Sequence, residues 1–181
     1  MLALSLLALG AVISLVVPAS AQAQRAGGGA KLTAAAQAAL LEALAGPDGE
    51  YAARATYAAI LAKWNNAQPF ANIYAAEVRH VEALVQQCKK YGVPVPADEF
   101  MGNVEAPADL CAAAEQGVAG EILNIAMYEG TPEPGDEPGL LEVVQQYPSL
   151  VLVFTNLRDA SLYNHLPAFR AAVATYCPSQ N

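Results

Sequence analysis

The sequence predicts an all-α protein with a four-helix core, and three observations support that class. Of the 181 residues, 55% are apolar and 14% are charged, which is enough apolar chain to build one domain with a sizeable core. Alanine, a helix former that is depleted in strands, is the most frequent residue type. Apolar residues recur three and four positions apart along several long segments, which is the spacing of amphipathic helices. A many-stranded barrel, and disorder over most of the chain, are therefore excluded.

The leading segment has the composition of a secretory signal peptide. Residues 1–17 carry no charge and are dominated by leucine, alanine and valine, and Pro18 and the small-x-small cleavage pattern Ala19-Ser20-Ala21 follow. The apolar run is short for a membrane span, but no basic residue precedes it, and a retained membrane anchor is the alternative. We expect cleavage after residue 21 or 23 and a secreted or periplasmic product. The predicted division of the chain is a signal peptide over 1–23, a flexible spacer over 24–32 and a helical domain over 33–177.

The first predicted helical stretch is broken once by a turn. Thr33 is a candidate N-cap for an alanine- and leucine-rich helix that reaches Ala45, and Gly46-Pro47-Asp48-Gly49 interrupts it. Helical spacing resumes at Glu50 and runs to Trp64. After a turn at residues 65–69, a second long helix is predicted over 70–91.

Proline and glycine also mark the ends of the remaining elements. Residues 92–96 end the second helix, and a connection leads to Pro107, after which a third helix is predicted over 108–129. An acidic, proline-rich loop covers 130–139, and a short helical segment is predicted over 140–146. A last, continuous helix is predicted over 149–176, because apolar residues keep helical spacing through and beyond the β-favouring run 151–154.

Every predicted long helix carries an acidic residue or a histidine on its apolar stripe. In the second helix, Glu77 and His80 form an E-x-x-H pair, whose side chains lie one turn apart on the same face. The chain has only two histidines, and both fall on such stripes. The polar residues that we single out on the stripes are Glu50, Glu77, His80, Glu121 and His165.

These residues need compensation if they are buried together. An unpaired buried carboxylate costs several kcal/mol, so a cluster of three must take up protons, pair with basic residues or bind cations. Arg54 and Arg158 are each candidates to neutralise one carboxylate, whereas Arg79 is expected to point away from Glu77. One or two divalent metal ions would satisfy the whole set, and glutamates from separate helices with a Glu-x-x-His pair are the ligands of four-helix di-metal carboxylate proteins. A hydrogen-bonded, metal-free core is the open alternative.

Other functional classes find little support in the sequence. Nine lysines and arginines against seventeen aspartates and glutamates give a net charge of −8, and a surface of that sign repels nucleic acid. No G-x-S-x-G, P-loop, dinucleotide-binding or H-E-x-x-H motif occurs. Tyr57 and Tyr128 lie on the same stripes as the glutamates, where an ordinary core role is favoured over a redox role. No stretch after Leu32 has the length and apolar character of a membrane span.

Several short motifs also carry a family resemblance. The stretches concerned are Glu50-Tyr51 with Tyr57, Pro69–Ile73, Ala76-Glu77 with His80, Ala83-Leu84, Tyr91–Pro96, Gly117–Glu121 and Asn164–Phe169. They occur in the same order as in a ferritin-like family of bacteria and archaea, catalogued as domain of unknown function 2202, which the chain resembles over residues 33–172.

The resemblance implies a ferritin-like four-helix bundle with a long crossover between helices 2 and 3. It also implies a centre of one or two iron or manganese ions, held by the five stripe residues, and ferroxidase or oxygen/peroxide-reducing chemistry if the protein is an enzyme. Two features depart from the usual di-iron pattern. Leu162 stands three residues before His165, where a second Glu-x-x-His would place its glutamate, and the break at residues 46–49 falls directly before Glu50. A mononuclear or mixed site is therefore left open, and no catalytic residue is assigned.

Three cysteines in an exported chain suggest one disulfide and one free thiol. In ferritin topology the crossover returns the chain to the opposite end of the bundle, so the third helix begins at the end where the fourth helix finishes. The resemblance therefore implies a disulfide between Cys111 and Cys177, with Cys88 free. A bundle without a crossover would favour Cys88 and Cys111 as the pair.

The sequence as a whole thus predicts an exported, ferritin-like metal-binding protein. The alternative is a metal-free helical bundle that acts as a binding or interaction module of the cell envelope. Metal ions are the expected partners, whereas nucleic acid and, after signal cleavage, a membrane are not. The metal, the substrate and the oligomeric state are left open.

Overall fold

The computed structural model describes residues 31–130 and 138–177, and its secondary structure there is helical, which confirms the all-α class. The predicted signal peptide, most of the predicted spacer, and residues 131–137 of the predicted proline-rich loop lie outside the described residues. The helices are α1 (Ala34–Ala45), α2 (Glu50–Lys63), α3 (Phe70–Tyr91), α4 (Leu110–Glu129), α5 (Leu140–Val143), α6 (Pro148–Ala160), the π-helical segment η1 (Ser161–His165) and α7 (Leu166–Tyr176).

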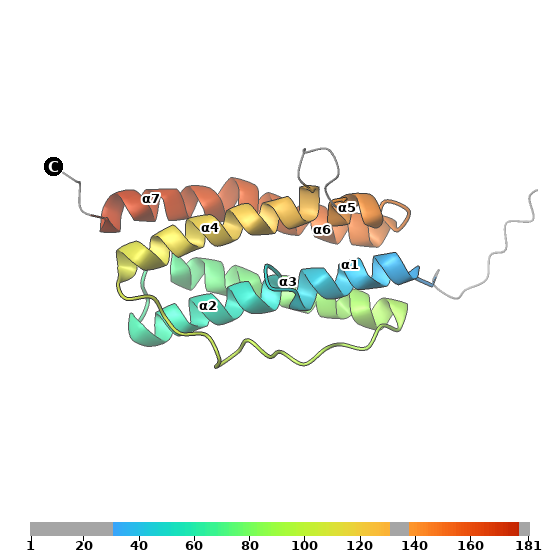
Figure 1. Cartoon of the computed structure of the whole chain (residues 1–181), viewed down its shortest axis with the longest axis horizontal. Coiled ribbons are helices and arrows are strands. Elements are labelled where there is room, and N and C mark those ends of the chain that lie inside the picture. The colour runs from blue at the N-terminus through green and yellow to red at the C-terminus, as the bar shows by residue number, and fades with distance from the viewer. Residues whose placement is uncertain (1–30, 131–137, 178–181) are drawn as a thin grey trace, which may run out of the picture.

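The helices lie side by side along the long axis of the molecule (Figure 1). Helices α1 and α2 follow one another end to end, and α3 runs back beside them. Helix α4 packs along α7 and η1. The segments α6, η1 and α7 follow one another end to end. Within the described residues, no helix has both the length and the apolar character needed to cross a bilayer.

The connection between α3 and α4 follows α2 from one end of the molecule to the other (Figure 1). Successive turns of α2 hold successive parts of this connection. The Tyr51 hydroxyl donates to the Pro96 carbonyl, the Arg54 guanidinium pairs with Asp98 at 2.5 Å, and Lys63 donates to the carbonyl oxygens at the end of the connection. Helices α3 and α4 consequently run in the same direction.

The local sequence determines where the helices that carry the candidate site residues begin. The Thr33 hydroxyl accepts from the Ala36 N–H, as its N-cap prediction requires. The break at residues 46–49 ends α1 and starts α2 at Glu50, so the carboxylate of Glu50 lies in the first helical turn, where the helix dipole favours a negative charge. Helix α4 begins two residues later than predicted, because Asp109 is its N-cap and accepts from the Ala112 N–H.

The prediction of one continuous helix over 149–176 was wrong at its centre. The α-helical ladder is interrupted by η1, where the Leu166 N–H donates to the Ser161 carbonyl five residues back. Pro167 follows directly and has no N–H to continue an α-helical ladder, so the extra residue is accommodated just before it. The predicted helix over 140–146 is also shorter, since α5 ends at Val143.

Two buried apolar clusters fill the interior, one toward each end of the molecule. The α1-end cluster joins α1 and α6 to the second half of α3, and the disulfide-end cluster joins α2 and α7 to the first halves of α3 and α4. Glu77 lies between them on α3, four residues from Ile73 of the disulfide-end cluster and four from Val81 of the α1-end cluster. Glu121 holds the equivalent place on α4. The buried polar residues therefore form a layer that separates two apolar cores.

The structure joins Cys111 and Cys177 by a disulfide, which is the pairing implied by the family resemblance. Their Cα atoms are 4.8 Å apart, so the bond ties the first turn of α4 to the residue after α7. Cys88 is free and buried among the residues of the α1-end cluster.

Candidate metal centre

The five polar residues singled out in the sequence meet in the layer between the two apolar cores. Helix α2 supplies Glu50, α3 supplies Glu77 and His80, α4 supplies Glu121, and η1 supplies His165. The three glutamates are each 2% exposed and His165 is 4% exposed, so four of the five are withdrawn from solvent. His80 is partly buried. The structure brings together every residue that the sequence proposed for this site.

Glu77 is the centre of the arrangement, because its two oxygens face different imidazoles. Its Oε2 atom lies 2.9 Å from His80 Nδ1, and its Oε1 atom lies 3.1 Å from His165 Nδ1. The two imidazole rings are stacked with centroids 5.6 Å apart and planes inclined by 24°. One carboxylate thus joins the two halves of the cluster.

Each half is completed by one further glutamate. Glu50 Oε2 lies 3.2 Å from His80 Nδ1, and Glu121 Oε2 lies 3.4 Å from His165 Nδ1. Two groups result, Glu50–Glu77–His80 and Glu77–Glu121–His165, and in each the candidate ligand atoms lie within 4.8 Å of one another. We call them the His80 triad and the His165 triad.

The outer oxygens of Glu50 and Glu121 are held by hydrogen bonds from tyrosines. Tyr57 donates to Glu121 Oε1 at 2.7 Å, and Tyr128 donates to Glu50 Oε1 at 3.0 Å. The inner oxygen of each carboxylate is the one that faces an imidazole. The tyrosines therefore fix the orientation of both carboxylates and leave one oxygen of each directed at its triad.

Asn124 and Ser161 belong to the same network and were not singled out as site residues from the sequence. The Asn124 amide donates to the Asp48 carbonyl at 3.1 Å and lies 3.4 Å from Glu50 Oε1, while Ser161 donates to Asn124 Oδ1 at 2.9 Å. Asn124 lies three residues after Glu121, a spacing that places both on one face of α4.

Ser161 lies four residues before His165, and the wider turn of η1 puts both side chains inside the protein. The position three before His165, which the usual di-iron pattern would fill with glutamate, is the partly buried Leu162. Ser161, which also interrupts the apolar stripe of the last helix, is the polar side chain that η1 directs toward Asn124. The centre consequently has three carboxylates and two imidazoles.

Burial and mutual contact shift the pKa values of four residues in opposite directions. Burial and then the charge of Glu77 raise the pKa of Glu50 to about 8. Burial alone would lower the pKa of both histidines, but the carboxylates outweigh it and raise the pKa of His80 to about 10 and that of His165 to about 9. Burial opposes ionisation of Glu77, yet its contacts with the imidazoles lower its pKa below the usual value. In the absence of a metal, imidazolium protons compensate the carboxylates at neutral pH.

Neither candidate arginine neutralises the cluster. Arg54 pairs with Asp98, and Arg158 pairs with Glu129 and Asp159. Arg79 is exposed, as expected for a side chain that points away from Glu77. Of the three ways to compensate the carboxylates, protons and cations remain.

The geometry of the cluster fits a metal ion. Two donor atoms bound at right angles to one ion at about 2.1 Å are about 3.0 Å apart, which is close to the separations between Glu77 and the two imidazoles. His165 Nδ1 is buried and has no partner with hydrogen-bond geometry among the described residues, although two carboxylate oxygens lie near it. Carboxylate oxygens with imidazole nitrogens suit iron, manganese and zinc.

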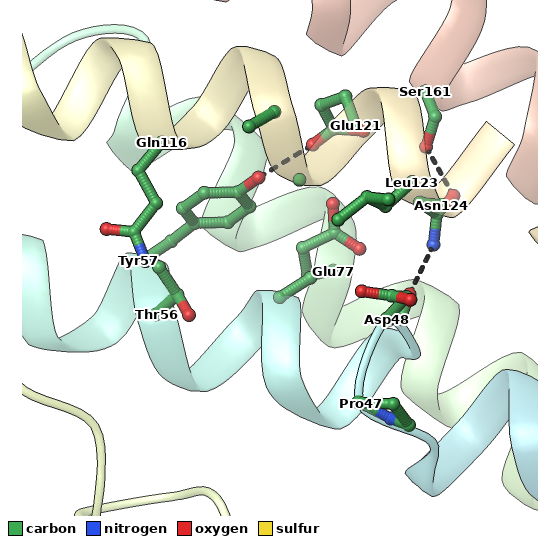
Figure 2. Close-up of a pocket in the computed structure, with 13 residues that line it drawn as sticks. Pro47, Asp48, Thr56, Tyr57, Glu77, Gln116, Glu121, Leu123, Asn124 and Ser161 are labelled. Atoms are coloured by element: carbon green, nitrogen blue, oxygen red, sulfur yellow. Dashed lines mark hydrogen bonds between the residues drawn. The ribbon is translucent and has the colours of Figure 1, made fainter. Parts of the chain in front are cut away.

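A cavity of about 250 Å³ reaches the cluster from the side of α2 and α4 (Figure 2). Its lining includes Glu77, Glu121 and Tyr57, and Figure 2 shows the hydrogen bond from Tyr57 to Glu121. A recess of about 370 Å³ between α3 and the η1–α7 segment has both histidines in its lining. The cluster is thus accessible from two sides.

Comparison with known proteins shows a similarity of fold. No protein-family model matches this chain, and no curated protein sequence matches it. The crystal structure of a hypothetical protein from Methanococcus jannaschii DSM 2661 is similar, with a TM-score of 0.58 and 23% sequence identity over 77% of this chain and 79% of that chain. At that identity the likeness concerns the fold alone.

Proposed function

We propose that this chain is a metal-binding protein that holds one or two divalent transition-metal ions between α2, α3, α4 and η1. The observation that carries the proposal is Glu77, whose two oxygens face the imidazoles of two triads within one buried layer. An arrangement of this kind lets one carboxylate bridge two ions, or lets a single ion take its ligands from either triad.

We further propose that the fold is a ferritin-like four-helix bundle with a crossover, and that the chain belongs with the family catalogued as domain of unknown function 2202. Support comes from the path of residues 92–109, which follows α2 along the molecule and makes α3 and α4 run in the same direction. The motifs that resemble those of that family contain all five triad residues.

In this proposal each polar residue has a defined task. Glu77 would offer one oxygen to each triad, Glu50 and His80 would complete the ligands of one triad, and Glu121 and His165 would complete those of the other. Tyr57 and Tyr128 orient the outer glutamates, and Asn124 and Ser161 support Glu50; they are positioning residues, as the hydrogen-bonded partners of metal ligands commonly are. A bound iron or manganese ion would supply redox chemistry, with ferroxidase or oxygen/peroxide reduction as the proposed activity.

The number of carboxylates predicts unequal binding of two ions. Three carboxylates carry three negative charges, whereas two divalent ions carry four positive charges. Leu162 stands where the usual di-iron pattern has its fourth carboxylate, and the neighbouring polar residue, Ser161, is neutral. We expect the first ion to bind more tightly than the second.

Metal analysis tests the proposal directly. Protein purified without added metal is analysed by elemental analysis and then titrated with Fe²⁺ under anaerobic conditions and with Mn²⁺. We expect up to two ions per chain in the wild type and loss of both in Glu77→Gln. Glu82→Gln, an exposed position on the same helix, is the matched control and retains full binding.

A metal-free interaction module is the competing function, and one observation favours it. The two imidazoles, with pKa values of about 10 and about 9, can compensate the carboxylates without a cation. If the wild type contains no metal and binds neither Fe²⁺ nor Mn²⁺ in the titration, the polar layer is a structural proton-bearing network and the metal proposal fails.

We also propose that the protein is exported. Support comes only from the uncharged apolar run and small-residue cleavage pattern in residues 1–23. The intact mass of the mature protein recovered from the periplasm or medium of an expressing bacterium tests this, and a full-length mass from the cytoplasm would contradict it.

A further inference from the structure

The two openings onto the cluster have different chemical linings. The first, which we call the α2–α4 cavity, has Glu77, Glu121 and Asp48 in its lining. The second, which we call the imidazole recess, is lined by both histidines and by Arg79. The opening on one side of the cluster is therefore lined by carboxylates, and the opening on the other side is lined by basic groups.

The α2–α4 cavity connects the surface with the buried layer. Residues of its rim, including Gln116, Gly120 and Leu123, are exposed, whereas Glu77 and Glu121 at its floor are each 2% exposed. Figure 2 shows Gln116, Leu123, Glu77 and Glu121 among the side chains that line this cavity. A hydrated ion or a molecule of a few atoms fits a volume of about 250 Å³.

Packing does not require a glycine at residue 120, which lies at the rim of the cavity. A methyl group added at Gly117, one turn earlier on α4, would come within 2.6 Å of the Phe169 ring. The close packing of α4 on Phe169 therefore requires glycine at residue 117. A methyl group added at Gly120 would meet nothing within 4 Å. Glycine destabilises the interior of a helix relative to alanine. At residue 120 the absence of a side chain leaves space that is part of the α2–α4 cavity.

We propose that the α2–α4 cavity is the entrance through which divalent cations reach the centre, and that Gly120 keeps its rim open. The inference rests on the proposed metal-binding function and adds to it the route and the charge class of what enters. Carboxylates along a narrow opening raise the local concentration of cations and their rate of entry. The guanidinium of Arg79 makes the recess a poor path for a cation.

The experiment measures how fast a metal enters, without any assay of activity. Co²⁺ is mixed with the full mature chain in a stopped-flow instrument, and binding is followed by the visible absorbance of the bound ion. Gly120→Leu fills the rim, and we expect its loading to be clearly slower than that of wild type. Gly120→Ala is the matched control and loads at the wild-type rate. Both variants keep the wild-type stoichiometry at equilibrium, because no ligand is changed.

Two further variants separate the route from general effects of mutation. Ala76→Leu narrows the imidazole recess and is expected to leave Co²⁺ loading unchanged. Asp48→Asn removes one negative charge from the cavity wall without changing its size, and we expect slower loading at low ionic strength that approaches the wild-type rate in high salt. Asp48→Asn keeps the test decisive if Gly120→Leu proves unstable by thermal melting.

The outcomes distinguish this inference from the function on which it rests. A wild type that binds no Co²⁺ at equilibrium contradicts the metal proposal itself. If the wild type binds Co²⁺ but Gly120→Leu and Asp48→Asn load as fast as wild type, or if Ala76→Leu is the slow variant, the metal centre stands and the α2–α4 entrance is overturned.

Discussion

Tyr57 and Tyr128 show how single residues prepare the centre. Each donates a hydrogen bond to the outer oxygen of a buried glutamate, and each is itself almost wholly buried. Because the donor is fixed by packing, the carboxylate cannot rotate freely, and its second oxygen stays directed at an imidazole.

Removing either hydroxyl is expected to cost stability and affinity together. Tyr57→Phe leaves Glu121 Oε1 without its hydrogen bond, and a buried unsatisfied acceptor costs about 1–3 kcal/mol. We expect that loss in urea unfolding of the metal-free protein and a fall in metal affinity of about tenfold or more. Tyr163→Phe, at a residue that is 67% exposed, is the control and should change neither quantity. Equal behaviour of the two variants would mean that Tyr57 does not position Glu121.

The raised pKa values predict how metal binding depends on pH. His80, His165 and Glu50, with pKa values of about 10, 9 and 8, hold protons at neutral pH in the metal-free protein, and a cation must displace them. Metal affinity should therefore rise steadily from pH 6 to pH 9. Calorimetric titration in two buffers of different ionisation enthalpy should detect the released protons. A constant affinity across this range would contradict the assignment of these residues as ligands.

The same shifts fix the sign of the stability change. The folded-state pKa values of these three residues exceed their ordinary values, so their contribution to the stability of the metal-free protein is lost as pH rises toward 10. Glu77 has the opposite shift, and its contribution is already complete above the usual pKa of a glutamate. The difference in melting temperature between metal-loaded and chelated protein should consequently widen with pH.

Sequence reasoning located the candidate ligands because each interrupts a regular apolar stripe. It did not locate Asn124 and Ser161 as site residues, because a neutral polar side chain on an inward face gives no sign of its partner. It also offered Arg54 and Arg158 as partners of the glutamates, whereas the structure pairs Arg54 with Asp98 and Arg158 with Glu129 and Asp159. Asp98 belongs to the irregular connection after α3, whose path no periodicity predicts.

At the scale of elements, the two interruptions in the helices serve the site. The break before α2 places Glu50 in a first helical turn, and η1 turns Ser161 and His165 into the same interior. Glycine and proline signalled the first break in advance. The second was missed because apolar spacing alone does not distinguish a continuous α-helix from one that contains a single wider turn.

Two glycines of α4 should respond oppositely to the same substitution. Gly117→Ala brings a methyl group within 2.6 Å of the Phe169 ring, and overpacking of this kind costs about 1–3 kcal/mol. Gly120→Ala enters open space and should stabilise the helix by about 0.5–1 kcal/mol. Urea denaturation of the two variants beside wild type measures both changes, and destabilisation at residue 120 would contradict the open rim.

At the scale of the whole molecule, the disulfide holds one end of the helical domain. Cys111 and Cys177 are 66 residues apart in sequence, and closing a loop of that length stabilises a fold by about 4 kcal/mol in the chain-entropy model. We expect reduction, or Cys111→Ala with Cys177→Ala, to lower stability by up to this amount, with Cys88→Ala showing the same sensitivity to reduction as wild type. Peptide mapping of unreduced protein should recover a fragment that links residues 111 and 177. A fragment that links Cys88 to Cys111 would contradict this pairing.

The polar layer between the two apolar cores has a consequence for cooperativity. We expect each core to open as one unit of local stability, because without a metal the two cores are joined through polar contacts rather than through continuous apolar packing. The disulfide lies at the end where α4 and α7 pack, so the unit built on α1 and α6 should open first. Native-state hydrogen exchange should show amides of α1 and α6 exchanging well before those of α4 and α7 in chelated protein. When a metal draws ligands from α2, α3, α4 and η1 at once, the two exchange rates should converge, because the same ion then makes both units open together.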